Sequence, residues 1–312
     1  MRICSSLFFE PVSSEEVEKF IKSLNENSSS GYDKISAKLL VKMSMWIVKP
    51  LQFVFNLSLS TGFVPNVLKK SLVVPLFKKG DTKIVTNYRP ISLTSCIAKV
   101  LEKIVKKRLC SFLQKHKILS NNQYGFREKM STQNAVNNVV RKVQEKIHEG
   151  KKPLLLLLDI EKAFDSISHA RLLDKLENVG VRGVARDWFK SYLKGRKQAL
   201  KVLVEAKQRV KLGEILSEEK YCCDGLPQGT VLSPLLFLIY VNELCNYETL
   251  GSIFSFADDT AILVAGSSWK ETYSMASKEI TKIFYWLKEN QLKLNIMKTS
   301  FIAFSANATG QP

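Results

Sequence analysis

Apolar residues recur at helical spacing in several long stretches of this chain. One stretch runs from 97 to 113 with lysine and arginine on its other face, and another runs from 132 to 149. The apolar positions of the second stretch that we expect to face inward are Ala135, Val136, Val139, Val140 and Val143. The sequence Ser13-Ser14-Glu15-Glu16 has the form of a capping box and predicts the start of a further helix. Residues 36 to 59 predict another helix, broken at Pro50.

The second half of the chain adds strand patterns. An unbroken run of leucines at 154–158 ends in Asp159 and predicts a buried strand that presents an acid at its end. Apolar residues on both sides of Asp258 and Asp259 predict a β-hairpin with the acidic pair at its tip. Residues 198–205 and 210–223 predict a paired strand insertion. Because strands and helices alternate irregularly, we expect an α+β fold and not a doubly wound sheet.

The three carboxylates at these strand ends indicate a chemistry. An Asp-Asp turn alone is a weak signal, because aspartate is an ordinary turn residue and a surface hairpin would have the same pattern. With Asp159 supplied by a separate buried strand, the set provides the oxygen ligands that two magnesium ions need in a phosphoryl-transfer site.

The charge of the chain narrows the choice of partner. Lysine and arginine number 47 against 29 acidic residues, a formal net charge of +18 over 312 residues. Such a surplus attracts polyphosphate backbones, although a merely soluble basic protein or a membrane-surface binder would also be basic. The six cysteines show no C-x-x-C spacing and the three histidines are scattered, which disfavours zinc and a disulfide framework. Without a signal-peptide or membrane-spanning pattern, the chain is expected to be intracellular and not secreted.

A series of motifs then stands in one order along the chain. They cover residues 78–81, 87–93, 123–127, 158–165, 225–237, 256–260 and 292–299. In this order they closely resemble the reverse transcriptase domain of non-LTR, LINE-type retrotransposons, and most nearly that of the jockey-like elements of animals. The resemblance runs from about residue 8 to residue 304.

The resemblance implies a right-hand polymerase core in a single domain over residues 1–312. The fingers would cover about 8–150 with a strand insertion at about 196–224, the palm about 151–195 and 225–304, and the tail 305–312. An antiparallel palm sheet flanked by helices would carry the acids. Full elements of this type have an endonuclease before this domain and thumb helices after it. Because the sequence stops at Pro312, shortly after Lys298, we expect the thumb to be missing.

The resemblance also assigns a metal site. Asp159, Asp258 and Asp259 correspond to the catalytic carboxylates that hold two Mg²⁺ ions, with Mn²⁺ as an alternative, and the Ile160 carbonyl completes the site. Clustered acids repel one another, and a bound pair of divalent ions relieves that repulsion.

Further residues correspond to nucleotide-binding positions of the family. Lys78 and Arg89 would grip the triphosphate, since an arginine fork binds phosphate oxygens in a bidentate manner, although Lys79 could replace Lys78. Phe164 would exclude a 2′-hydroxyl group, unless it is an ordinary core residue. The remaining assignments are contact with the templating base pair for Gln228, close approach of the backbone to substrate for Gly229, and action on the pyrophosphate leaving group for Lys298.

The activity implied is that of an RNA-directed DNA polymerase, which adds deoxynucleotides to a DNA primer 3′-hydroxyl on an RNA template. Its partners would be template RNA, primer DNA and dNTPs in the nucleus or cytoplasm, with no membrane; the oligomeric state is not predicted. Three alternatives stay open. They are a catalytically silent, truncated RNA-binding remnant, a reverse transcriptase of another lineage such as a group II intron maturase or telomerase relative, and a non-enzymatic basic scaffold.

Overall fold

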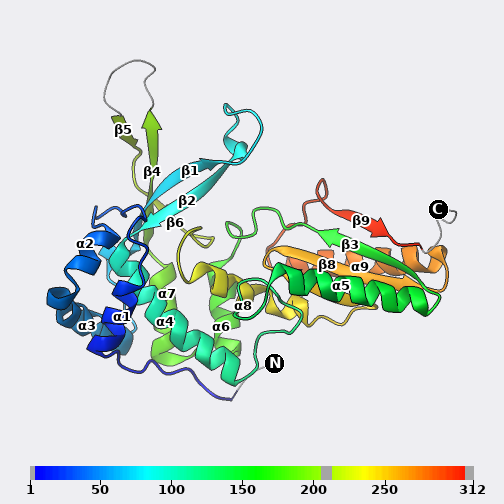
Figure 1. Cartoon of the computed structure of the whole chain (residues 1–312), viewed down its shortest axis with the longest axis horizontal. Helices are drawn as coiled ribbons and strands as arrows, with labels where there is room; N and C mark the ends of the chain where they lie inside the picture. Colours follow the sequence, from blue (N-terminus) through cyan, green and yellow to red (C-terminus); the bar gives the residue numbers. More distant parts are fainter. Residues whose placement is uncertain (1–3, 205–212, 306–312) are drawn as a thin grey trace. The chain divides into compact units, whose positions relative to one another are not determined.

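A computed structural model describes residues 4–204 and 213–305 of the chain (Figure 1). The chain forms two compact units that alternate along the sequence. The first unit comprises Met1–His116 and Leu172–Ser233, and the second comprises Lys117–Arg171 and Pro234–Pro312. Each unit contains its own β-sheet with helices beside it, so the mixed α and β character expected from the sequence is present in both.

The sheet of the first unit is built around a long hairpin. Strands β1 (Lys70–Phe77) and β2 (Tyr88–Thr94) pair antiparallel, and a short 3₁₀ turn, η2 (Val85–Asn87), precedes β2. Strand β4 (Arg196–Val204) runs parallel to β1 and pairs with both β5 (Gly213–Leu216) and β6 (Lys220–Cys222). The predicted strand insertion is therefore present, except that residues 205–212 lie outside the described residues.

Helices accompany this sheet in the first unit. They are α1 (Ser14–Lys22), α2 (Ala37–Lys42), α3 (Ser44–Thr61), η1 (Asn66–Lys69), α4 (Cys96–Lys115) and α7 (Gly183–Leu193), while α6 (His169–Asn178) carries the chain from the second unit into the first. The predicted cap of α1 is confirmed, because the Ser13 side chain accepts a hydrogen bond from the Glu16 N–H at 3.2 Å.

The predicted helix break at Pro50 is wrong. Pro50 lies inside α3, and the interruption between α2 and α3 falls at Met43 instead. Pro50 is exposed to solvent, so water can hydrate the Trp46 carbonyl that loses its helical N–H partner.

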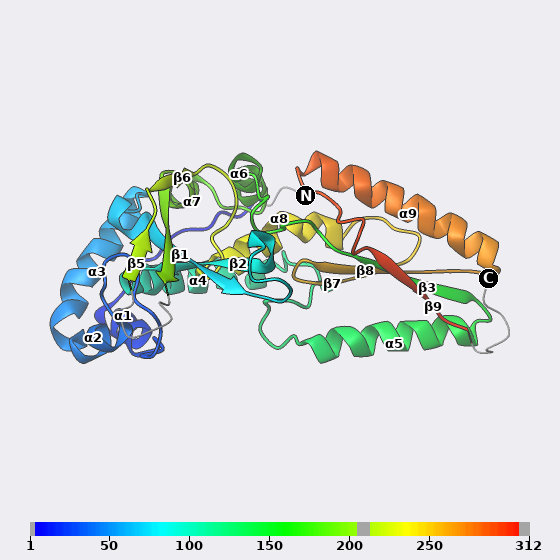
Figure 2. The ribbon, with the colours of Figure 1, turned by 90° about the horizontal axis from the view of Figure 1, so that it is seen from above.

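The second unit contains an entirely antiparallel sheet. Its strand order is β7 (Ser252–Phe256), β8 (Asp259–Gly266), β3 (Lys152–Leu158) and β9 (Ser300–Ala303). Helices α5 (Thr132–His148) and α9 (Trp269–Glu289) lie on opposite faces of this sheet, as Figure 2 shows, and α8 (Ser233–Cys245) begins at the boundary of the unit.

Covering of both faces explains the leucine run of β3. In a strand with one wet face, apolar and polar residues alternate, whereas a strand covered on both faces is apolar throughout. Leu154 and Leu156 are 1% and 3% exposed, and Leu155, which points to the other face, is 6% exposed. The predicted buried strand is confirmed, and it delivers Asp159 at its end.

The inward face of α5 is narrower than predicted. Ala135, Val139 and Val143 pack against the core cluster of the sheet, but Val136 and Val140 are 58% and 48% exposed. Residues four apart lie on one line of a helix, so the 135–139–143 line faces the sheet and its neighbours turn to solvent. Within residues 4–204 and 213–305, no helix has the length and apolar content needed to cross a membrane.

Candidate active site

The acidic pair lies on a tight hairpin of the second unit. Strands β7 and β8 are joined by the two residues Ala257 and Asp258, and Phe256 pairs with Asp259. Ala257 has a φ of +60°, in the left-handed region that tight two-residue hairpin turns require. Asp258 is thus in the turn and half-buried, while Asp259 opens β8 and is exposed. The hairpin prediction is confirmed.

The register of the sheet brings Asp159 to the same edge. Strands β3 and β8 are antiparallel, and Leu158 lies opposite Thr260. Asp159 is the residue after Leu158, and Asp259 is the residue before Thr260, so the two acids occupy adjacent positions on neighbouring strands. Asp159, Asp258 and Asp259, which lie up to 100 positions apart in the sequence, are therefore at the same end of strands β3, β7 and β8. We call this end of the sheet the acidic edge.

The charges at this edge act on one another. Desolvation raises the pKa of the Asp259 carboxyl, the carboxylates of Asp258 and Asp159 raise it further, and Lys298 opposes the shift. Like charges held together in this way favour either protonation or binding of a cation.

Asp159 is held by two side chains from the segment before β9. The Asn295 amide donates a hydrogen bond to Asp159 Oδ2 at 2.8 Å, and Lys298 Nζ lies 3.6 Å from the same oxygen. The backbone pairs as well, because the Asn295 N–H donates to the Asp159 carbonyl and the Glu161 N–H to the Lys293 carbonyl, both at 2.8 Å. Sequence reasoning named Lys298 at this site and missed Asn295, although Asn295 belongs to the same motif.

The Ile160 carbonyl keeps its acceptor capacity in this pairing. Ile160 and Leu294 form an isolated antiparallel bridge, and its two hydrogen bonds use the backbone groups on either side of Ile160. The carbonyl of Ile160 takes part in neither bond, so it remains a candidate oxygen ligand beside Asp159.

The donor set suits a hard cation. In the described parts of the chain, no group of three or more His, Cys, Asp or Glu side chains already converges in metal-binding geometry. At the acidic edge the Lys298 ammonium lies beside Asp159. The ligands available there are all oxygens, which Mg²⁺ and Mn²⁺ prefer, and not the nitrogen and sulfur atoms of zinc sites.

Phe164 lies a short turn beyond Asp159, after a left-handed Lys162 with φ +46°. Its ring stacks on Phe237 of α8 with centroids 4.8 Å apart and meets the edge of Phe126 at 6.3 Å. Phe237 is fully buried, whereas Phe164 is only half-buried. Phe164 is therefore stacked on α8 but is not fully buried, which differs from an ordinary core phenylalanine.

The predicted triphosphate-binding residues lie in the first unit, on the β1–β2 hairpin. Arg89 lies on β2, opposite Leu76 of β1. Lys78 follows β1, and its N–H donates to the Asn87 carbonyl at 2.8 Å. Both side chains are exposed, as is Lys79. Among residues 4–204 and 213–305, neither Lys78 nor Arg89 has a side-chain hydrogen bond or ion pair, so both remain free to bind an anion.

The loop that carries Gln228 and Gly229 is tied to the same hairpin. The Ser92 N–H of β2 donates to the Gln228 carbonyl at 2.7 Å. Gly229 has a φ of +104°, and a Cβ atom added there would lie 3.0 Å from the Ser92 carbonyl oxygen. Only glycine fits this conformation and this close approach.

A buried carboxylate fixes the end of that loop. Glu102 of α4 is 2% exposed, and its Oε2 accepts hydrogen bonds from the N–H groups of Val231 at 2.6 Å and Leu232 at 3.3 Å. Its Oε1 accepts from the Tyr192 hydroxyl at 3.1 Å. Burial raises the pKa of Glu102, while Arg196 and the two N–H groups oppose the shift. Sequence reasoning missed Glu102, although an acid within the apolar stripe of that helix was a visible signal.

The site residues therefore fall into two groups. Asp159, Ile160, Phe164, Asp258, Asp259 and Lys298 belong to the second unit, and Lys78, Arg89, Gln228 and Gly229 belong to the first.

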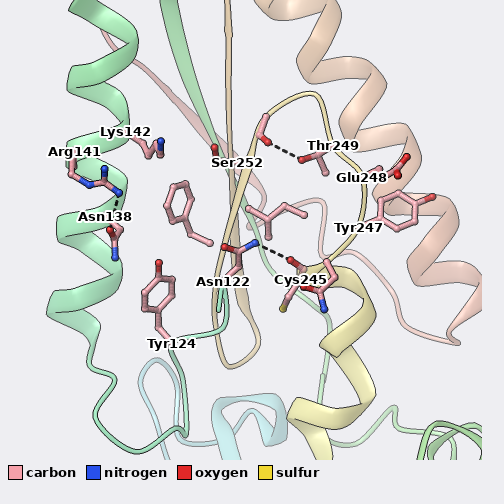
Figure 3. Close-up of a pocket in the computed structure, with 14 residues that line it drawn as sticks. Asn122, Tyr124, Asn138, Arg141, Lys142, Cys245, Tyr247, Glu248, Thr249 and Ser252 are labelled. Carbon is pink, nitrogen blue, oxygen red and sulfur yellow. Dashed lines mark hydrogen bonds between the residues drawn. The ribbon is translucent and has the colours of Figure 1, made fainter. Parts of the chain in front are cut away.

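A separate cavity of about 540 Å³ lies in the second unit. Figure 3 shows it between α5, the segment around Asn122 and Tyr124, and the loop from Cys245 to Ser252. Its lining combines the cations Arg141 and Lys142 with amides and aromatic rings, and it includes none of the predicted site residues.

Comparison with known proteins identifies the family of the chain. A family model described as reverse transcriptase (RNA-dependent DNA polymerase) matches residues 76–311. A probable RNA-directed DNA polymerase from transposon BS of Drosophila melanogaster is 27% identical over 94% of this chain and 32% of that protein. The RNA-directed DNA polymerase from mobile element jockey of Drosophila melanogaster is 26% identical over 98% of this chain and 33% of that protein.

A further relative, a probable RNA-directed DNA polymerase from transposon X-element of Drosophila melanogaster, is 25% identical over 97% of this chain and 32% of its own length. The chain thus spans about a third of the length of the curated relatives it matches. The matched region includes every predicted site residue, from Lys78 to Lys298. The chain therefore belongs to the reverse transcriptase family, and its relatives identify it as the jockey-like, non-LTR kind that the motif order predicted.

Proposed function

We propose that this chain is an RNA-directed DNA polymerase that extends a DNA primer on an RNA template by a two-metal mechanism. The observation that carries the proposal is the collection of Asp159, Asp258 and Asp259 at one edge of an antiparallel sheet through the β3–β8 register. In this reading the second unit contains the palm sheet, and the β1–β2 hairpin of the first unit belongs to the fingers.

The acidic edge would hold two divalent cations, Mg²⁺ or Mn²⁺. Asp159, Asp258, Asp259 and the Ile160 carbonyl would hold these ions. When bound, such ions stabilise the attacking and leaving oxygens of an in-line phosphoryl transfer. The protein itself must keep the carboxylates together despite their repulsion. The hydrogen bond from Asn295 orients Asp159, and the charge of Lys298 partly offsets that of Asp159.

The first unit would bind the incoming nucleotide. Lys78 and Arg89 present exposed cations on one hairpin, and an arginine fork is suited to bidentate contact with phosphate oxygens. The Gln228–Gly229 loop is bonded to the strand that carries Arg89, which supports a role for Gln228 beside the templating base pair. Phe164 would lie under the sugar and exclude a 2′-hydroxyl, and Lys298 would neutralise or protonate the pyrophosphate leaving group.

The partners follow from this reaction. They are template RNA, primer DNA and dNTPs, and a net charge of +18 supports binding to their backbones. Such a reaction takes place in the nucleus or cytoplasm. The silent RNA-binding alternative is not favoured, because all three acids are retained and share one edge.

Primer extension tests the proposal. The purified chain, given poly(rA), an oligo(dT) primer and thymidine triphosphate, should extend the primer when Mg²⁺ or Mn²⁺ is added and stop when EDTA removes the ion. Retained RNA binding without extension in either ion would overturn the proposal and favour the silent remnant.

A further inference from the structure

A short segment of the second unit lies along the free edge of β7, next to the acidic turn. The Tyr124 N–H donates to the Ser255 carbonyl and the Ser255 N–H donates to the Asn122 carbonyl, both at 2.8 Å. Gln123 and Ser255 thereby form a parallel bridge two residues before Ala257. The segment therefore contacts the hairpin at the point where it turns.

The Gln123 side chain reaches from this segment into the turn. Its Oε1 accepts hydrogen bonds from the Ala257 N–H at 3.1 Å and from the Gly125 N–H at 2.9 Å, and its Nε2 donates to Ser255 Oγ at 3.0 Å. The Ser255 hydroxyl in turn donates a hydrogen bond to the Ala257 carbonyl at 3.5 Å. Gln123 is 1% exposed, so water does not compete for these bonds.

The turn needs such support because of its backbone. Ala257 adopts φ +60°, a conformation that is unfavourable for any residue with a Cβ atom. Ala257 directly precedes Asp258. A Cβ atom added at Gly125 would lie 2.3 Å from the Ala257 nitrogen, so the two backbones are in direct contact. The strained alanine is therefore held on one side by Gly125 and on its N–H by Gln123.

The segment is itself fixed to α8. The Asn242 side chain accepts from the Ser120 N–H and donates to the Ile118 carbonyl, both at 2.9 Å. Figure 3 shows the bond from the Asn122 amide to the Cys245 carbonyl, which is 3.1 Å long. Arg127 also donates to the carbonyls of Ser120 and Gln123, so it organises this segment. Helix α8 thus supports the segment whose Gln123 side chain is bonded to the Ala257 turn.

We propose that Gln123 is a positioning residue for the metal site, which holds the strained Ala257 turn so that the Asp258 carboxylate is aimed at the cations. This inference rests on the proposed function, because it assumes that Asp258 binds a metal. It deepens that function by assigning a second support of the ligand set, alongside Asn295 at Asp159.

Metal binding to a stalled complex tests the inference. The chain is loaded with template, a primer ending in a dideoxynucleotide and the next matching dNTP, so that no reaction occurs, and Mn²⁺ is titrated by electron paramagnetic resonance. Gln123→Met, which keeps the side-chain length but removes both the acceptor and the donor, should weaken Mn²⁺ binding by about tenfold. Adding Ala257→Gly should restore most of the affinity, since glycine adopts φ +60° without strain.

A matched control separates positioning from stability. Tyr240→Phe removes the hydrogen bond from the Tyr240 hydroxyl to the Asn290 carbonyl, 2.7 Å long and also buried in the second unit. It should lower the melting temperature while leaving Mn²⁺ affinity unchanged. If Gln123→Met does not fold, Gln123→Asn takes its place; it keeps the neutral amide but is one methylene too short to reach the Ala257 N–H, so it should also weaken Mn²⁺ binding by about tenfold.

The outcomes distinguish the two proposals. If Asp258→Ala weakens Mn²⁺ binding but Gln123→Met does not, or if Ala257→Gly brings no recovery, the role of Gln123 is overturned and the proposed function stands. Mn²⁺ binding by Gln123→Asn within about threefold of wild type would overturn that role as well. If Asp258→Ala binds Mn²⁺ and extends primers like wild type, the metal site itself is misassigned.

Discussion

The acidic edge of the second unit and the cationic hairpin of the first unit are organised in opposite ways. At the acidic edge, Asp159 is bonded to Asn295 and lies beside Lys298, and the turn before Asp258 is gripped by the buried Gln123. On the hairpin, Lys78 and Arg89 project into solvent, and within the described residues neither side chain has a partner.

The difference has a physical reason. Carboxylates that share one edge repel one another, so only a surrounding framework can keep them together before a cation arrives. Cations on a long exposed hairpin face no such obstacle, and their flexible stems can adapt when an anion arrives. Under the proposed function, the fold would hold the metal ligands near one another in advance, and the substrate would organise the phosphate-binding residues.

The largest effect should come from the preorganised side. Asp159→Ala, Asp258→Ala or Asp259→Ala should each reduce primer extension by about a thousandfold or more, because each removes a proposed metal ligand. RNA affinity, measured by filter binding, should stay close to wild type, since it depends on lysine and arginine. Glu161→Ala, an exposed acid next to this edge, serves as the control and should extend normally. Near-normal extension by Asp258→Ala would show that the acidic edge is not the active site.

The free cations should show a smaller effect that is specific to the nucleotide. Arg89→Ala should lower kcat/KM for the dNTP by about a hundredfold, and Arg89→Lys should give an intermediate value because it keeps charge but loses the fork. Steady-state kinetics at varied dNTP would measure both. Lys83→Ala, another exposed cation of the same hairpin region, is the control. The contrast between the two regions would collapse if Arg89→Ala matched Lys83→Ala.

Phe164 combines the two modes, because its ring stacks on Phe237 while the residue is only half-buried. Phe164→Val should leave dNTP extension within about tenfold of wild type but raise ribonucleotide use by about a hundredfold, as a steric exclusion of about 3 kcal/mol implies. The ratio of extension efficiencies for the two nucleotide types is the readout. Phe126→Leu, which replaces the neighbouring ring without adding a β-branch at its positive φ, should leave this ratio unaltered. An unchanged ratio in Phe164→Val would make it a packing residue only.

The smallest effect on chemistry, and a large one on stability, should come from Glu102. Glu102→Ala leaves two buried N–H groups and the Tyr192 hydroxyl without their acceptor, which should lower the free energy of unfolding by about 3 kcal/mol. Glu102→Gln keeps an acceptor and should cost much less. Urea denaturation at pH 7 compares the two, and equal losses would contradict the role of Glu102 as the anchor of the Gln228 loop.

The same residue gives a pH dependence with a defined sign. Burial raises the folded-state pKa of Glu102, so ionisation disfavours the folded state, and this contribution to stability falls as pH rises from the unfolded pKa of about 4.3 through the raised value. Glu102→Gln does not titrate. The unfolding free energy of Glu102→Gln minus that of wild type should therefore increase between pH 4.5 and pH 8, and a decrease would contradict the buried, destabilised carboxylate.

Much of this molecule was accessible from local sequence signals. The leucine run predicted β3 because five adjacent apolar residues before an acid fit a strand covered on both faces. The Ser13 cap and the Asp258 hairpin were likewise visible, since caps and tight turns depend on residues only a few positions apart. The order of the motifs predicted the family that the comparisons show.

The supports of the site were decided by the tertiary structure alone. Asn295 reaches Asp159 across 136 positions, Gln123 reaches Ala257 across 134, and Glu102 reaches Val231 across 129. No local pattern encodes such pairs, because each depends on which strand edges and helices come together in the folded chain. The predictions for Pro50 and Val140 were wrong for the same reason. Pro50 is accommodated in α3 and Val140 faces solvent on α5 because of their solvent exposure, and exposure is a property of the folded molecule. The sequence by itself predicted which residues would carry the chemistry, and the tertiary structure determined which others contact and support them.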